Sequence, residues 1–208
     1  MHESNLVTDF KMKIQKKGAY KFGLLAYPAK GSLSPLLFNN AFKKFKINAE
    51  YNLYNVKPSE FESFMKKLPK SGITGLSVSA PYKTIVMNFL DFVSSDAKKI
   101  GAVNTIFIKE DRLFGFNTDH LGAFEAISSS KKKLGKILIF GAGGACRAVV
   151  YGLIKNSVPR EDITIANRTF SNAKKTANDF GVKYVKLSDV SDMDFNTIIN
   201  TSTKLPIP

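Results

Sequence analysis

Residues Lys136 to Tyr151 read KILIFGAGGACRAVVY. A short apolar run, Ile137 to Phe140, enters a glycine-rich turn, and small and apolar residues follow it. This order predicts a strand, a tight turn and a helix. Gly141 permits the turn, Gly143 lets the backbone approach a pyrophosphate, and the helix N-terminus offers N–H groups and a positive dipole end. The stretch therefore predicts a site for a dinucleotide.

The next strand-like run indicates which dinucleotide. After Ile163 to Ala166 come Asn167, Arg168 and Thr169, where an NAD site would usually carry an acidic residue. An arginine there suits a 2'-phosphate, which favours NADP. Cys146 stands at the third small-residue position of the glycine motif, and we expect it to pack the helix rather than to act as a nucleophile. The alternative is a glycine turn that only packs a helix on a sheet.

Strand-like and helix-like segments alternate along the chain, which predicts an α/β fold with a mostly parallel sheet. The length allows two domains, and we expect the boundary near residue 130, before the lysine triplet Lys131 to Lys133. The expected strands are 20–27, 51–56, 75–79, 106–108, a run into Gly115, 137–140, 163–166, 183–185 and 195–201; the expected helices are 36–45, 59–68, 84–92, 121–127, the one after the glycine turn, and 171–180.

Composition excludes several classes of function. The net charge of +14 comes from 31 Lys and Arg against 17 Asp and Glu, but the lysines are scattered as solvated pairs. Because no helix-turn-helix, zinc finger or RNP-type pattern accompanies them, we expect no nucleic acid partner. A single cysteine gives no disulfide framework and no metal site. No apolar run approaches about 18 residues, so we expect no membrane span and a cytoplasmic protein. Residues 1–20 read as an extension or edge element without assignable chemistry.

Two serines stand in a loop bounded by Pro28 and Pro35. Ser32 and Ser34 are two residues apart, so their hydroxyls point the same way on an extended backbone and could hold a polyol or a carboxylate. The alternative is an ordinary helix start, with Ser34 as N-cap and Pro35 as first helical residue. Residue types alone favour that helix start.

Several short motifs stand together in one order: Ser32-Leu33-Ser34-Pro35, Pro81-Tyr82-Lys83, Gly101-Ala102-Val103-Asn104-Thr105, Asn117-Thr118-Asp119, the glycine turn, and Asn167-Arg168-Thr169. With them the chain resembles the shikimate dehydrogenase family over roughly residues 20–203. The resemblance implies a three-layer α/β/α architecture, with a substrate-binding and catalytic domain over 1–130, an NADP-binding Rossmann domain over 131–208, and a cleft between them. It implies reversible reduction of 3-dehydroshikimate to shikimate by NADPH, in chorismate and aromatic amino-acid biosynthesis, by a monomer or homodimer.

The resemblance also implies roles for single residues. Lys83 and Asp119 match the family's catalytic pair. The chemistry agrees, since hydride delivery to a ketone builds negative charge on its oxygen and a proton donor must lie within reach; which of the two is the acid stays open. The positions that hold the substrate's carboxylate and hydroxyls are matched by Ser32, Ser34, Ser79 and Asn104.

The cofactor positions are carried over in the same way. The pyrophosphate turn is matched by Gly141, Ala142, Gly143, Gly144 and Ala145, and the 2'-phosphate site by Asn167, Arg168 and Thr169. The loop that contains Thr201 resembles one that follows a late Rossmann strand and runs close to the cofactor.

Departures from the family pattern keep other functions open. Ser77 stands where the family commonly has an asparagine, which leaves a quinate or aminoshikimate dehydrogenase possible. Asn172 stands where a second arginine often assists with the 2'-phosphate, and Lys174 or Lys175 could compensate. Family chains usually continue well beyond residue 208, so we expect a Rossmann domain that lacks its C-terminal part. A non-catalytic NADP-binding regulatory module is therefore a third hypothesis.

His120 follows the catalytic candidate Asp119 directly. A histidine beside a carboxylate suggests a proton relay. Because the family pattern gives this position no role, we expect His120 to be a surface neighbour.

Overall fold

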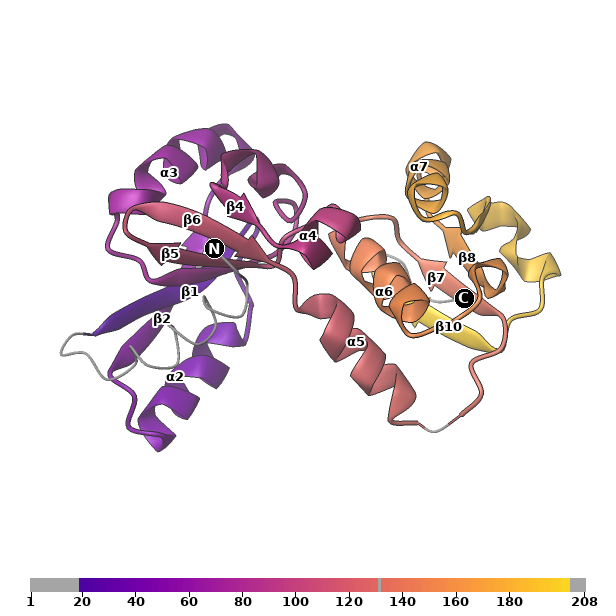
Figure 1. Cartoon of the computed structure of the whole chain (residues 1–208), viewed down its shortest axis with the longest axis horizontal. Helices are drawn as coiled ribbons and strands as arrows, with labels where there is room; N and C mark the ends of the chain where they lie inside the picture. The colour runs from indigo at the N-terminus through magenta and orange to yellow at the C-terminus, as the bar shows by residue number, and fades with distance from the viewer. Residues whose placement is uncertain (1–18, 131, 203–208) are drawn as a thin grey trace. The chain divides into compact units, whose positions relative to one another are not determined.

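The computed structural model describes residues 19–130 and 132–202, and its contacts divide the chain into two compact units. The first runs up to Ser95 and includes Val103–Phe116; the second comprises Asp96–Ala102 and the chain from Asn117 onward. The helix directly before the expected boundary near residue 130 thus groups with the second unit. Each unit has its own sheet (Figure 1). Most of the N-terminal segment 1–20, and Lys131 of the lysine triplet, lie outside the described residues.

The sheet of the first unit has the strand order β2-β1-β3-β5-β6-β4. Strands β2, β1 and β3 are parallel, whereas β5 is antiparallel to both β3 and β6, and β4 is parallel to β6. The carboxyl ends of β1 and β3 therefore meet at one edge, together with the start of β5. The strands are β1 Tyr20–Ala26, β2 Ala49–Asn55, β3 Gly75–Val78, β4 Phe92–Val93, β5 Thr105–Lys109 and β6 Arg112–Phe116.

Helices cover this sheet on both faces. Helix α2 (Ser34–Lys44) packs Phe42 against the cluster that contains Leu24 and Tyr51. Helix α3 (Phe61–Lys67), extended by the short 3-10 turns η1 (Pro58–Glu60) and η2 (Leu68–Lys70), buries its apolar face. The amphipathic helix expected over 59–68 is confirmed, and its buried residues are Phe61, Met65 and Leu68.

The outer edge of β2 is occupied by a side chain of α2. The Asn39 amide accepts a hydrogen bond from Tyr51 N (2.9 Å) and donates one to Tyr51 O (3.0 Å). One amide thus satisfies both outward-facing backbone groups of that residue, as a neighbouring strand would do.

The helix expected over 84–92 is wrong for most of its length. The chain forms only the 3-10 turn η3 (Ile85–Phe89) and then strand β4. Asp91 explains the change, because its N–H donates to Leu113 O (3.0 Å) and its carboxylate accepts from Leu113 N (2.7 Å). Pairing with β6 therefore replaces the last helical turn, an effect of tertiary structure that local sequence does not contain.

The second unit has a fully parallel sheet with the order β10-β7-β8-β9. Its central strand β7 (Ile137–Phe140) is buried throughout, as expected of a strand covered on both faces. Helices α5 (Asp119–Ser128), α6 (Gly144–Lys155) and α7 (Phe170–Phe180) cover one face, and η5 (Leu187–Asp192) covers the other. The other strands are β8 Ile163–Ala166, β9 Lys183–Val185 and β10 Thr197–Asn200.

Helices α5 and α6 approach each other closely at a glycine. A Cβ atom at Gly152 would lie only 2.6 Å from the carbonyl oxygen of His120. Any larger residue at this position would push the first turn of α5 away.

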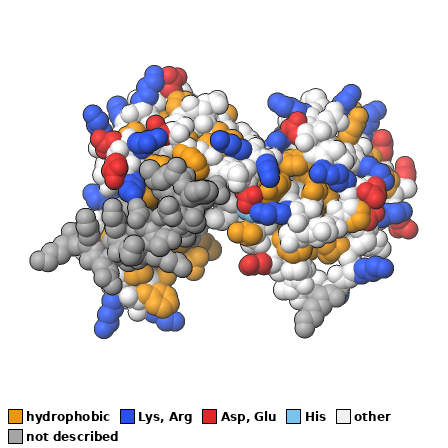
Figure 2. Space-filling model, viewed as in Figure 1, with side chains coloured by type: hydrophobic (Ala, Val, Ile, Leu, Met, Phe, Trp, Pro, Cys, Tyr) orange, Lys and Arg blue, Asp and Glu red, His pale blue; other side chains and the backbone are white. Residues whose placement is uncertain are grey.

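Charge is spread rather than concentrated. Lys and Arg side chains are scattered over the face drawn in Figure 2. Between residues 19 and 202, leaving out residue 131, no helix combines the length and the apolar character needed to cross a membrane.

Candidate active site

Two loops of the first unit are joined at the carboxyl edge of its sheet. Tyr27 N, after β1, donates to Ala80 O (3.1 Å), and Ser79 N, after β3, donates to Leu25 O (2.9 Å). The expected substrate residues of this unit lie on these loops or just before β5. Open α/β sheets carry their sites at this edge. The sequence-predicted residues gathered there are Ser32, Ser34, Ser79, Lys83 and Asn104.

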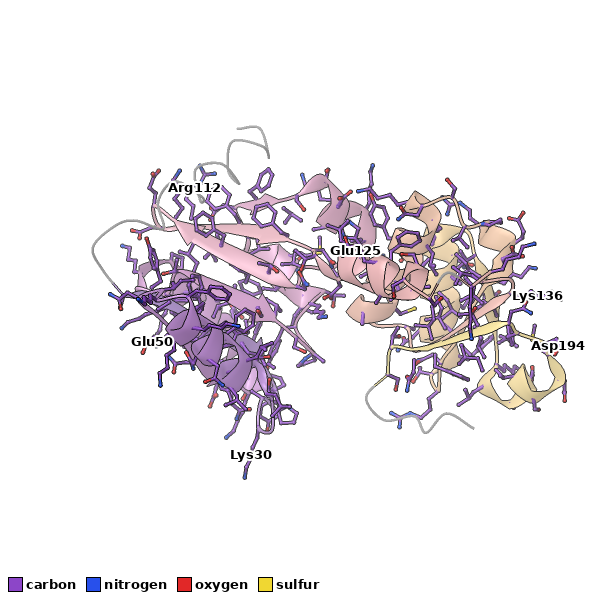
Figure 3. The ribbon with its side chains drawn as sticks, turned by 90° about the horizontal axis from the view of Figure 1, so that it is seen from below. Lys30, Glu50, Arg112, Glu125, Lys136 and Asp194 are labelled. Carbon is purple, nitrogen blue, oxygen red and sulfur yellow. The ribbon has the colours of Figure 1, made fainter. Side chains whose placement is uncertain are left out.

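The two loop serines face each other. Ser32 Oγ and Ser34 Oγ are 3.1 Å apart, and Ser34 N donates to Ser32 Oγ (3.3 Å). Leu33 is the N-cap residue of α2, and Ser34, as the first helical residue, makes no side-chain cap. The capping hypothesis for Ser34 is therefore wrong, and both half-buried hydroxyls point to one side. Lys30, earlier in the loop, points outward (Figure 3).

The backbone at Lys83 is fixed by a hydrogen bond and by the burial of its neighbour. Its carbonyl oxygen accepts a hydrogen bond from Val103 N (2.7 Å). The preceding residue, Tyr82, is fully buried, stacks on Phe61 with 4.3 Å between ring centroids, and donates its hydroxyl proton to Val56 O. The half-buried Lys83 side chain thus projects from an anchored loop at the carboxyl edge.

Asn104 connects that loop to the antiparallel part of the sheet. Its carbonyl oxygen accepts from Val78 N (2.7 Å) and its N–H donates to Phe116 O (3.0 Å). Its side-chain oxygen accepts the Thr105 hydroxyl (2.9 Å). These bonds fix Asn104 beside the end of β3, from which Ser79 follows.

Asp119 belongs to the second unit and is the first residue of α5. Its N–H donates to Asn117 Oδ1 (3.0 Å), and Asn117 Nδ2 donates to Ala102 O (3.0 Å). Asn117 is 5% exposed. Asn117 stands in the motif Asn117-Thr118-Asp119, but its part in holding the first turn of α5 could not be predicted from that motif.

The glycine turn joins β7 to α6 as expected. Gly141 has a φ of +108°, and a Cβ there would lie 2.5 Å from Thr201 Oγ1, so only glycine fits. Thr201, directly after β10, donates from N (2.8 Å) and Oγ1 (2.7 Å) to Phe140 O. A Cβ on Gly143 would meet no described atom within 4 Å.

The order of strands explains why these residues meet. The chain passes from β7 outward through β8 and β9 and then returns to the other side of β7 as β10. This reversal is a topological switch point, where open parallel sheets bind their ligands.

Asn167, Arg168 and Thr169 follow β8, the parallel neighbour of β7. Asn167 Nδ2 donates to Thr169 O (3.0 Å), and Thr169 is the N-cap of α7. Arg168 and Thr169 are exposed. Gly141 N donates to Ala166 O (2.9 Å), so the glycine turn and this segment share one sheet edge.

Thr176 of α7 was missed by the sequence analysis. Its hydroxyl donates to Ala142 O (3.1 Å) in the glycine turn, and the residue is 4% exposed. The helical spacing of Thr176 with Ala173, Ala177 and Phe180 could have predicted its burial, because all four lie on the buried face of α7.

Cys146 is fully buried, which agrees with the packing role expected from the sequence. Burial raises the pKa of its thiol from 9.0 to about 12, although the Arg147 charge and a hydrogen bond with Thr201 act in the opposite direction. A raised pKa keeps the thiol neutral throughout the pH range 6–9.

We expect the folded protein to resist thiol reagents. A pKa raised by about three units lowers the thiolate fraction at pH 8 by about 1000-fold, and burial blocks access as well. Reaction with Ellman's reagent should be absent in native buffer and complete in guanidinium chloride. Stoichiometric labelling of the native protein would contradict this assignment.

The expectation for His120 is wrong. Its side chain is buried, with 2% of the residue exposed, because it projects from α5 against Tyr151 of α6 and Asp96 of α4 (Ser95–Ile100). The pattern of apolar residues in the few positions around His120 does not show whether this histidine is buried or faces solvent.

These features define a class of protein: an α/β protein with a Rossmann-type strand, glycine turn and helix in one unit and a polar sheet edge carrying a lysine in the other. The substrate-binding-domain model of shikimate dehydrogenase matches residues 24–106, and the shikimate/quinate 5-dehydrogenase model matches residues 125–207. The chain belongs to the shikimate dehydrogenase family.

Individual proteins that are similar to this chain are also shikimate dehydrogenases. The NADP(+) shikimate dehydrogenase of Caldanaerobacter subterraneus subsp. tengcongensis is 39% identical over 191 residues, which are 88% of this chain and 68% of that enzyme. A Thermus thermophilus shikimate 5-dehydrogenase solved with NADP(H) and shikimate has a TM-score of 0.77 and 31% identity, over 88% and 68% of the two chains. The Listeria monocytogenes enzyme, solved with shikimate and NAD, has a TM-score of 0.76 and 28% identity, over 90% and 70%.

Proposed function

We propose that this chain catalyses the NADP-linked interconversion of 3-dehydroshikimate and shikimate, an oxidoreductase reaction at a CH–OH group. The observation that carries the proposal is the sheet edge of the first unit, which collects hydroxyls, an amide and a lysine ammonium. A polyhydroxylated carboxylate requires this mixture of donors and acceptors. Membership of the shikimate dehydrogenase family favours shikimate as the substrate within the shikimate and quinate class.

The substrate side of the proposal rests on four residues. Ser32 and Ser34 present paired hydroxyls, and Ser79 and Asn104 flank the loop that carries Lys83. We assign all four to the carboxylate and hydroxyls of the substrate. Residues up to about 130 would then form the substrate-binding and catalytic domain, and those from 131 the NADP domain.

The catalytic side rests on Lys83 and Asp119. Bound NADPH would supply a hydride to the carbonyl carbon of the substrate, and negative charge would then develop on the carbonyl oxygen. The Lys83 ammonium, on its anchored loop, is suited to donate a proton or hydrogen bond to that oxygen. We assign Asp119, whose N–H is held by Asn117 at the start of α5, as the other member of the catalytic pair.

The cofactor side rests on the turn and on the end of β8. Residues Gly141 to Ala145 and Thr201 suit the pyrophosphate, because Gly143 leaves its side of the turn open and the N-terminus of α6 offers N–H groups. Asn167, the exposed Arg168 and Thr169 suit the 2'-phosphate of NADP. The donors present therefore fit this cofactor.

The proposal is tested by steady-state turnover. NADPH absorbance is followed with shikimate, then with quinate, and with NADP or NAD as oxidant. We expect turnover with shikimate and NADP. Faster turnover with quinate would instead support the quinate dehydrogenase reading that Ser77 keeps open. NADPH binding without turnover would support a regulatory module.

The proposal includes a cytoplasmic enzyme that acts on a small molecule, without nucleic acid, as a monomer or homodimer. Light scattering of the purified protein distinguishes the two states of assembly. A larger assembly would contradict this part of the proposal.

A further inference from the structure

A partly buried polar cluster surrounds the first turn of the helix that begins with Asp119. It consists of Asp96 in α4 (Ser95–Ile100), His120 in α5, and Tyr151 and Lys155 in α6. All four residues belong to the second unit. None of them is used in the proposed chemistry, and His120 is the residue directly after the proposed catalytic Asp119.

The Asp96 carboxylate is the centre of this cluster. Tyr151 OH donates to Asp96 Oδ1 (2.6 Å), and Lys155 Nζ donates to Asp96 Oδ2 (2.8 Å). His120 Nε2 lies 3.4 Å from the same Oδ2. The His120 ring also meets the Tyr151 ring edge to face, with 5.4 Å between centroids. One carboxylate therefore connects three separate helices.

The electrostatics keep Asp96 ionised and Tyr151 protonated at neutral pH. Burial raises the pKa of Asp96, but the hydrogen bonds from Lys155 and Tyr151 and the nearby positive charge outweigh it, so the pKa is lowered and the carboxylate is ionised. Burial and the bond to Asp96 raise the pKa of Tyr151 to about 12, so its hydroxyl remains a donor. A charged acceptor surrounded by donors makes stronger hydrogen bonds than a neutral one.

His120 is confined on its backbone as well as on its ring. Its carbonyl oxygen lies where a Cβ on Gly152 would be 2.6 Å away, so α5 rests directly on the backbone of α6. The ring is buried, and neither nitrogen makes a full hydrogen bond among the described residues, so the 3.4 Å approach of Nε2 to Asp96 Oδ2 is its polar contact there. A buried imidazole without full hydrogen bonding costs free energy. The fold thus retains a costly polar ring beside Asp96 where an apolar side chain would pack without that cost.

We propose that His120 is a positioning residue for Asp119. The contact with Asp96 fixes the rotation of the first turn of α5, and this rotation sets the direction of the Asp119 carboxylate. Asn117 holds the same turn from its other end, through Asp119 N and Ala102 O. The proposal deepens the proposed function and rests on it, because Asp119 matters only if it acts in the reaction.

The test compares His120→Phe with His120→Gln. Phenylalanine keeps a ring against Tyr151 but has no nitrogen for Asp96, whereas glutamine keeps an N–H donor of similar reach. We expect His120→Phe to lower kcat about 10-fold, part of the roughly 100-fold that a 1 Å misplacement can cost. The KM values for shikimate and NADP should stay within about twofold, and His120→Gln should recover most of kcat.

Two further variants make the test specific. Asp96→Asn should lower kcat about as much as His120→Phe, and the double variant should be no worse than either, because both act through one contact. Glu125→Gln, on α5 in Figure 3 and exposed, serves as the control and should match the parent protein. An unchanged kcat in folded His120→Phe, additive losses, or equal losses in the Phe and Gln variants would overturn the proposal.

A readout without turnover separates this proposal from the proposed function. Hydrogen–deuterium exchange of residues 117–124 should be faster in His120→Phe than in the parent, while exchange of α6 is unchanged. If the parent protein does not oxidise shikimate, the proposed function is wrong. If exchange of residues 117–124 is the same in His120→Phe and in the parent, His120 does not hold this turn, whatever the activity.

Discussion

Replacing Lys83 by alanine is expected to lower kcat by roughly 10²- to 10⁴-fold, the range for losing a general acid or base. The ammonium group donates a proton or a hydrogen bond to the substrate oxygen during hydride transfer, and the alanine side chain has no donor. The fold should survive, because the loop is held by the Lys83 carbonyl and by the Tyr82 side chain, and the substitution changes neither. Steady-state kinetics with shikimate and NADP, together with circular dichroism, measure both parts of this expectation.

The matched control is Lys67→Ala, which removes an exposed lysine from α3 in the same unit. It should leave kcat unchanged. If Lys83→Ala is folded and turns over at the parental rate, Lys83 is not the proton donor and the assignment of the pair fails.

Arg168→Ala is expected to raise the Kd for NADPH by about 10- to 100-fold and that for NADH by much less. Hydrogen bonds to a charged group are worth roughly 1.5–3 kcal/mol, and only NADPH carries the 2'-phosphate. Because Arg168 is exposed and lies before the N-cap of α7, its loss should not change the stability of the second unit. Titration of both dinucleotides by fluorescence or calorimetry gives the two ratios.

Net charge requires its own control, since the chain carries +14 and any lost cation weakens an anion's binding slightly. Arg112→Ala removes an equal charge from the start of β6 in the other unit (Figure 3). We expect it to bind both dinucleotides as the parent does. Equal losses of NADPH and NADH affinity in Arg168→Ala would show that Arg168 does not contact the 2'-phosphate.

The second unit could be predicted closely from sequence because its signals are local. A buried apolar run, a turn that only glycine permits at Gly141, and a helix of small residues fall within 20 consecutive positions. The arginine after the next strand then reaches the same edge, since parallel neighbours end together. Strands β7, β8 and β9 have the expected bounds, and the helix expected over 171–180 spans Phe170–Phe180.

The errors arise where a distant residue decides the outcome. Strand β4 exists because Asp91 pairs with Leu113, 22 positions later. His120 is buried because Asp96 and Gly152 lie against it from other helices. Neither the period of apolar residues nor residue propensity contains such contacts. The roles proposed for Lys83, Asp119 and the serines stay predictions until the variants are measured.

The amide of Asn39 has a consequence for how this chain behaves among many copies of itself. An uncovered edge strand is a template onto which a second chain can add by backbone pairing, which leads to fibres or misassembled dimers. At Tyr51 both outward-facing backbone groups are already satisfied by one side chain. The protein therefore protects that point of its sheet against aggregation with a single residue of a neighbouring helix, and the carboxyl ends of β1 and β3, where the substrate is proposed to bind, stay open.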